Sequence, residues 1–306
     1  MRHEGHNRGE IMLHISISAE RLWTIFGLPI SNAFLTTWIV MGLLIVLAVI
    51  ATRKMSLIPS NAQLIAESLI GSLHDVFGAI AGTKINQFFP LVATLFLFIL
   101  TANWIGLLPG VGTVGFYREE TEAGKISELK PVVPENTATV DHAVVTSQIS
   151  VPALTEPAEV PKDEHKTEFV PLFRAATADL NMTLALAIVA VLAMQYFGFR
   201  NLGTHYLGRF INFRDPIMFS VGLLEIVSDI SKVLSFAFRL FGNIFAGEVL
   251  LAVIAFLIPF IVPLPFLMME IFVGFIQAFV FSMLTTAFLS LAVSHGEGEH
   301  KIEAHA

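Results

Sequence analysis

Residues 216–258 read PIMFSVGLLEIVSDISKVLSFAFRLFGNIFAGEVLLAVIAFLI, one long and largely apolar helical pattern. At about 1.5 Å per residue, such a helix is longer than the ~30 Å hydrocarbon core of a bilayer. Prolines at positions 259, 263 and 265 follow it and force a turn. A last apolar helix is predicted over residues 266–294. These two segments predict an all-α integral membrane protein.

Polar residues recur on one side of the 216–258 helix. When successive residues are rotated by roughly 100°, the following five fall within an arc of about 80°: Glu225, Asp229, Lys232, Arg239 and Asn243. A charge in hydrocarbon costs at least ~2.5–3.5 kcal/mol, so such residues are functional candidates. For Glu225, Asp229 and Lys232 an alternative stays open, because charges near the water interface can pair or snorkel to it.

Arg239 is the strongest functional candidate. No acidic residue lies within four positions of it, so the neighbouring helical turns supply no neutralising partner. A permanently charged guanidinium of this kind predicts a partner on another chain. Glu248 lies off the polar side, and Glu270 and Gln277 share one face of the last helix.

Composition supports the membrane assignment and excludes several classes. Of the 306 residues, 55% are hydrophobic and only 14% are charged, whereas soluble domains carry about a quarter charged residues. The net charge of −7 argues against nucleic-acid binding. Cysteine is absent, which excludes disulfides and thiolate metal sites. None of the 10 histidines lies in the middle of a long apolar run, so paired-histidine haem ligation is excluded.

Three further apolar segments predict spanning helices, at residues 32–51, 87–108 and 179–198. The first is preceded by a polar start that does not fit a signal peptide. Residues 61–80 place apolar side chains on one side of a helical wheel and polar ones on the other, which predicts an amphipathic helix in the membrane interface. Packing of that helix on a protein partner is the alternative. The fold expectation is therefore about five spanning helices plus one interfacial helix.

Three segments of the sequence resemble parts of one known protein family. The segment SKVLSFAFRLFGNIFAGE at 231–248 strongly resembles the signature of subunit a of the F-type rotary ATP synthase. TADLN at 177–181 and FIQAFVFSMLTTAFLSLA at 275–292 resemble further parts of it. The order of segments from about residue 20 to 294 matches, apart from an insertion at 117–170.

The resemblance implies a stator subunit with two offset aqueous half-channels. Arg239 matches the essential arginine that faces the rotating ring of c subunits and couples proton translocation to ring rotation and ATP synthesis. The other matching positions along the implied proton path are Asn243, Glu248, Gln277, Glu225, Lys232, Ser235, Asn103, Asp179 and Asn181. Implied partners are the c-ring, the peripheral-stalk b subunits, the remainder of the complex and the lipid bilayer. The last two helices are implied to form a hairpin against the ring.

The resemblance also implies a multi-pass protein of the bacterial inner membrane, with the N-terminus outside and the C-terminus cytoplasmic. The distribution of basic residues does not decide this orientation. No catalytic site, cofactor or metal is expected, and the chain contains no GxxxxGK[ST] phosphate-binding loop. Both H⁺ and Na⁺ fit as the coupling ion.

Two positions depart from the family pattern. Position 270 is Glu, where some relatives have a His paired with the Glu at position 248. We therefore hypothesise that Glu248 and Glu270 share a proton in the outer half-channel. Gly106 stands where the family often has an acidic residue.

The expected organisation has five parts. They are an N-terminal extramembrane segment at 1–31, two spanning helices with the interfacial helix at 32–116, an extramembrane loop at 117–170, a membrane domain with the proton-path helices at 171–294, and a polar tail at 295–306. The 117–170 loop has 11 acidic and 5 basic residues and contains five prolines. A tolerated insertion is favoured for it over a partner-docking or ion-attracting loop.

Other functional classes fit less well. A secondary transporter would explain buried charges, but such folds usually contain inverted repeats, and none is visible here. A passive anchoring subunit would not need Arg239 or the polar side of its helix. An intramembrane enzyme is disfavoured because no HExxH or GxSxG arrangement occurs. Co-purification of a ring of small hairpin proteins, each with one intramembrane carboxylate, separates the leading interpretation from these.

Overall fold

The computed structural model describes residues 21–25, 28–53, 61–112, 114–119, 167–203, 206, 216–258 and 261–303. The chain divides into two compact units, one formed by residues 1–115 and 171–306 and the other by residues 116–170. The predicted N-terminal segment up to residue 20 and the loop interior at 120–166 lie outside the described residues.

Long apolar helices dominate the larger unit. They are α1 (Asn32–Thr52), α3 (Ile85–Gly106), α4 (Leu180–Leu202), α6 (Pro216–Leu257) and α7 (Pro263–Glu303). The described residues contain five helical stretches long and apolar enough to cross a membrane. The prediction of an all-α integral membrane protein is confirmed. One of these stretches joins α3 to α2 (Asn61–Ala81) through the short 3₁₀ helix η1 (Gly82–Lys84).

Short strands accompany the helices. Strands β1 (Arg21–Ile25) and β2 (Leu28–Ser31) pair antiparallel just before α1. Strand β3 (Pro109–Gly112) follows α3, and β4 (Gly115–Glu119) and β5 (Thr167–Pro171) form a second two-stranded sheet. A 3₁₀ helix, η3 (Ala176–Ala178), leads into α4. None of these elements was predicted from the apolar pattern.

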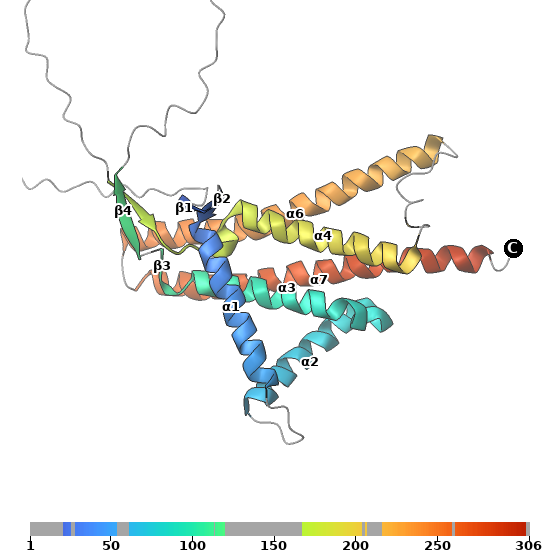
Figure 1. The fold of residues 1–306 in the computed structure, drawn as a ribbon, viewed down its shortest axis with the longest axis horizontal. Coiled ribbons are helices and arrows are strands. Elements are labelled where there is room, and N and C mark those ends of the chain that lie inside the picture. The colour runs from blue at the N-terminus through green and yellow to red at the C-terminus, as the bar shows by residue number, and fades with distance from the viewer. Residues whose placement is uncertain are drawn as a thin grey trace, which may run out of the picture. The chain divides into compact units, whose positions relative to one another are not determined.

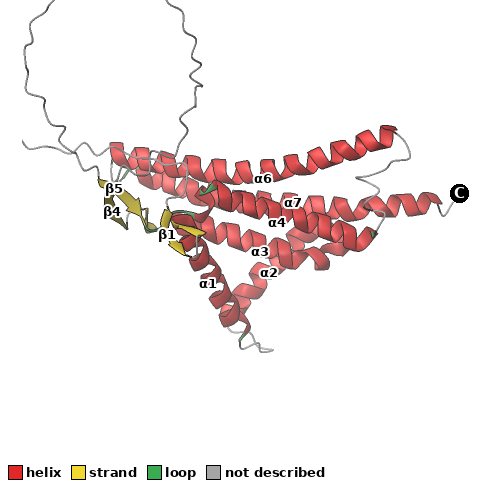
Figure 2. Ribbon diagram, turned by 45° about the horizontal axis from the view of Figure 1, so that its top comes forward, coloured by secondary structure: helices red, strands yellow, loops and turns green. Residues whose placement is uncertain are grey.

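The axes of helices α3, α4, α6 and α7 lie roughly along one line, with α3 and α6 running opposite to α4 and α7, whereas α1 and α2 are inclined to them and approach each other away from the bundle (Figure 1, Figure 2). Helix α7 contacts α3, α4 and α6, and α4 contacts α6. Small buried residues such as Ala237 and Ala278 allow this close approach. Among the described residues, the fully buried large side chains include Phe77, Phe88, Phe96, Phe281, Ile99, Leu240 and Leu289.

Helix α2 forms over the predicted range, and it buries part of the predicted apolar side. Leu73 and Phe77 are buried in the core, where Phe77 stacks on Phe279 of α7 with ring centroids 6.4 Å apart. Ile65 and Ile80 of the same helix are exposed. Some apolar side chains of α2 are therefore buried against the other helices, and the exposed ones are available to contact lipid. Location in the membrane interface stays a prediction.

Helix ends differ from the prediction mainly at α7. It begins at Pro263, which suits the first helical position because proline lacks a donor there. It continues to Glu303, beyond the predicted end at 294. The added stretch contains the helix-favouring residues Glu297, Lys301 and Glu303, and helix propensity does not require apolar side chains.

Candidate functional site

Arg239 lies on the exposed side of α6. Ala237 and Leu240 next to it are buried against the bundle, whereas Ser235, Arg239 and Asn243 are exposed. Nη2 of Arg239 donates to Oγ of Ser235 at 3.4 Å, and no carboxylate of the described residues lies within ion-pair distance. The guanidinium therefore has its charge available to something outside this part of the chain.

A hollow of about 360 Å³ lies beside Arg239. Its lining is mainly polar on the α6 side and aromatic or aliphatic on the α7 side. The lining residues are Ser228, Ser231, Lys232, Ser235, Phe236, Arg239, Leu284 and Phe288. It connects the predicted site residues Ser235 and Lys232 with Arg239 in one continuous space along α6.

One turn beyond Arg239, a side-chain hydrogen bond joins the two last helices. Asn243 Nδ2 of α6 donates to Gln277 Oε1 of α7 at 2.7 Å. Asn243 is exposed, whereas Gln277 is buried. The structure thus brings together two residues that were predicted separately, and it gives α6 and α7 a polar contact beside Arg239.

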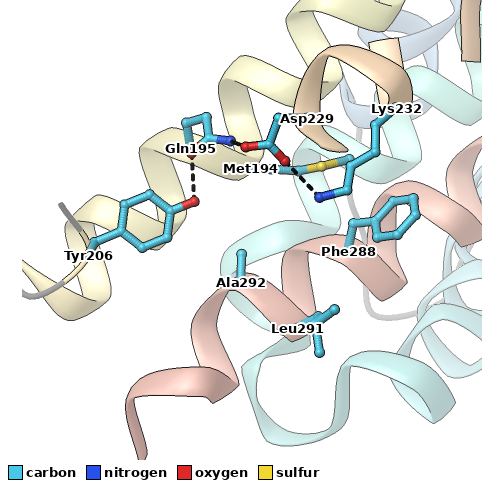
Figure 3. A pocket seen from close by; sticks show the side chains of 8 residues that line it. All are labelled: Met194, Gln195, Tyr206, Asp229, Lys232, Phe288, Leu291 and Ala292. Carbon is cyan, nitrogen blue, oxygen red and sulfur yellow. Dashed lines mark hydrogen bonds and ion pairs between the residues drawn. The ribbon is translucent and has the colours of Figure 1, made fainter. Parts of the chain in front are cut away.

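Lys232 lies in a network of polar side chains rather than alone (Figure 3). Its Nζ is 2.7 Å from Asp229 Oδ1 and 3.9 Å from Glu225 Oε1. The other Asp229 oxygen accepts from Gln195 Nε2 of α4 at 2.6 Å. Tyr206 in turn donates its hydroxyl hydrogen to Gln195 Oε1 at 2.6 Å. This geometry agrees with the alternative left open by the sequence, in which Glu225, Asp229 and Lys232 pair with one another.

Glu248 and Glu270 occupy neighbouring places on α6 and α7 but contact different groups. Glu248 forms an ion pair with Arg174, with Nε 3.3 Å from Oε1. The Glu270 carboxylate lies against Gly247, where an added Cβ would overlap with it. Glu270 is 4% exposed, and its Oε1 has no hydrogen-bond partner among the described residues. Sharing of a proton between the two carboxyl groups stays a prediction.

Three further predicted residues, Asn103 in α3 and Asp179 and Asn181 at the start of α4, make different contacts in the structure. Asn103 is buried between helices, donating to Gly274 O at 3.0 Å and accepting from Thr177 Oγ1 at 2.7 Å. Asp179 caps α4, since its Oδ1 accepts from Asn181 N at 3.1 Å. The Asn181 side chain is exposed.

Sequence reasoning missed Arg174, Gly247 and Gln195. Arg174 follows the acidic 117–170 loop in the sequence. Its partner lies 74 residues away, so no local spacing could reveal the pair. Gly247 precedes Glu248 in the AGE segment, and nothing in that segment indicates which helix approaches the glycine. In the described ranges, no three His, Asp or Glu side chains gather to hold a metal ion.

Comparison with known proteins yields one family. The family model described as ATP synthase A chain matches residues 34–290. "ATP synthase subunit a" of Trichlorobacter lovleyi is 31% identical over 270 residues, covering 87% of this chain and 89% of the relative. The proteins of the same name from Citrifermentans bemidjiense and from Geobacter sp. strain M21 are each 29% identical over 268 residues, with the same coverage.

Proposed function

Because this chain belongs to the ATP synthase A chain family, we propose that it provides the two half-channels and the arginine that couple proton movement to rotation of the c-ring. As a member of the family it is a proton-translocating, non-catalytic subunit of the membrane sector of ATP synthase. It is a multi-pass membrane protein that works in a complex with the c-ring. Nucleotide chemistry takes place elsewhere in that complex.

The exposed, carboxylate-free position of Arg239 carries the proposal. A ring carboxyl that faces lipid must be protonated, because an isolated ion in hydrocarbon is prohibitive. Next to Arg239 the ionised form is favoured by Coulomb attraction at low dielectric. A ring carboxyl that passes Arg239 therefore releases its proton to one aqueous half-channel and takes up another from the second.

The polar residues around Arg239 fall into two groups that suit two offset half-channels. We assign Asn103, Asp179, Asn181, Asn243, Gln277, Glu248 and Glu270 to the outer one. We assign Ser235, Lys232 and Glu225 to the cytoplasmic one, and the hollow beside Arg239 supports this because Ser235 and Lys232 line it. Each elementary charge that crosses releases about 2.3 kcal/mol per 100 mV, which is the work available to turn the ring.

The rest of the organisation is proposed on the same basis. The N-terminus lies outside and the C-terminus lies in the cytoplasm of a bacterial inner membrane. Helices α6 and α7 form a hairpin that docks on the c-ring. The exposed apolar residues of α1, among them Trp38, Ile45 and Ile50, face lipid or the peripheral-stalk b subunits. We propose that the chain is organised in five parts, at residues 1–31, 32–116, 117–170, 171–294 and 295–306.

Substitution of Arg239 tests the proposal. We expect Arg239→Ala to abolish ATP-driven proton pumping and ATP synthesis in inverted membrane vesicles without loss of the assembled complex. Arg239→Lys should also pump poorly, because a compact ammonium lacks the planar fork and can lose its proton. The matched control is Arg200→Ala, which removes an exposed arginine at the end of α4. Normal synthesis in either Arg239 variant would remove the assignment.

A further inference from the structure

A second arginine, Arg174, contacts the proposed proton path and is held differently from Arg239. It lies between β5 and η3 and is 7% exposed. Its Nε is 3.3 Å from Glu248 Oε1, and its Nε and Nη2 donate to Glu248 Oε2 at 3.4 and 3.3 Å. Both carboxylate oxygens of Glu248 therefore contact one guanidinium, an arrangement that fixes the direction of the carboxylate.

The backbone around Arg174 is anchored on both sides. Leu172 N donates to Val114 O at 2.8 Å, and Gly112 N donates to Phe173 O at 2.8 Å. After Arg174, the chain packs Ala175 directly against α3. Because the backbone is already held by these contacts, the guanidinium gives up little additional freedom when it binds Glu248.

Gly106 is the contact point of Ala175 on α3. An added Cβ at Gly106 would lie 2.5 Å from the Ala175 Cβ, so no side chain fits there. The absence of a side chain at Gly106 lets the segment that carries Arg174 approach α3 closely.

The two ends of the ion pair differ in access. The Arg174 side chain is 8% exposed, whereas the Glu248 side chain is 38% exposed. The carboxylate can therefore be reached from one side while the arginine holds it from the other. Along α6, Glu248 is nine residues from Arg239, a rise of about 13 Å.

We infer that Arg174 is a positioning residue of the proton path: a fixed counter-ion that holds and orients the Glu248 carboxylate between proton transfers. The two arginines then divide the work. Exposed Arg239 meets charges that arrive on another chain, and buried Arg174 balances one charge that stays in place. A carboxylate that stays ionised at membrane depth is stabilised by such a partner. This inference rests on the proposed function, since it gives Glu248 a role in proton transfer.

The test compares Arg174→Met, which keeps most of the side-chain bulk without the charge, with Arg174→Lys, which keeps the charge. Each is assayed in the whole complex in inverted vesicles, with pumping rates divided by the amount of assembled complex. We expect Arg174→Met to slow pumping by about tenfold or more, and we expect Arg174→Lys, which keeps the charge but lacks the planar fork, to be slowed less than Arg174→Met. Arg200→Met is the control for loss of an exposed arginine.

A double variant separates charge balance from packing. If Arg174 acts through Glu248, then Arg174→Met/Glu248→Gln pumps at the rate of Glu248→Gln alone, because the partner is already gone. If Arg174→Met fails to assemble, the same double variant should assemble again. An additive loss, no recovery of assembly, or a Lys variant as slow as Met overturns the inference.

Arg239→Ala, assayed in the same vesicles, tests the proposed function separately from the inference about Arg174. Loss of pumping in Arg239→Ala together with normal pumping in Arg174→Met would remove only the inference about Arg174. Normal pumping in Arg239→Ala would remove the proposed function itself.

Discussion

At the scale of single residues, the informative feature is whether a charge in the membrane part has a partner. Arg239 could be predicted because an isolated cation is visible in the linear order of residues: no acidic side chain lies within four positions. Arg174 could not, because the residue that balances it is distant in the chain and no periodicity connects them. Long-range pairs of this kind depend on how loops fold back onto helices.

The buried carboxyl group of Glu270 leads to a prediction about a single substitution. Its carboxylate is buried, and one oxygen has no hydrogen-bond partner among the described residues. We expect Glu270→Gln to lower ATP-driven proton pumping by about tenfold or more, because the amide keeps the size of the side chain but cannot carry the proton.

Proton pumping per assembled complex is the measurement for this prediction. Glu67→Gln, which removes an exposed carboxylate from α2, serves as the control. Unchanged pumping in Glu270→Gln would remove the hypothesis that Glu248 and Glu270 share a proton.

At the scale of helices, apolar runs located all five long helices to within a few residues, except at the C-terminal end of α7. That end is polar, and a polar helix leaves no hydropathy signal. The contacts between helices were less predictable. The AGE segment indicates nothing about α7, yet Gly247 is the place where a side chain of α7 lies directly on the backbone of α6.

The close approach at Gly247 predicts a strong effect of one methyl group. We expect Gly247→Ala to displace Glu270 and to lower proton pumping severalfold or more. Overpacking of this type typically costs about 1–3 kcal/mol of stability, and a flexible Glu side chain places the cost at the low end.

The control is Gly42→Ala on α1, where nothing lies within 4 Å of the added Cβ. That variant should assemble and pump like the wild type. Equal behaviour of the two variants, in the yield of complex and in pumping, would mean that the contact between Gly247 and Glu270 has no functional weight.

At the scale of the whole molecule, the number of crossings determines how the ends are arranged. If each of the five stretches among the described residues that are long and apolar enough crosses the membrane once, the two termini lie on opposite sides, and the basic residues do not decide which side is which. The short strands before α1 and after α3 could not be predicted, because they pair within segments that contain no clear alternation of apolar and polar residues.

The absence of cysteine makes the orientation testable. A membrane-impermeant maleimide applied from outside should label Val114→Cys, which follows α3 at a 51% exposed position, and should leave Thr52→Cys at the end of α1 unlabelled. In inverted vesicles the pattern should be reversed. The opposite result in both preparations would place the N-terminus in the cytoplasm.

The outward direction of Arg239 also has a consequence for biogenesis. A newly inserted copy of the chain without its neighbours would expose a guanidinium to acyl chains, at a cost of at least ~2.5–3.5 kcal/mol on insertion scales. On the proposed function, docking on the ring removes this cost, so the exposed charge favours the assembled chain over the isolated one.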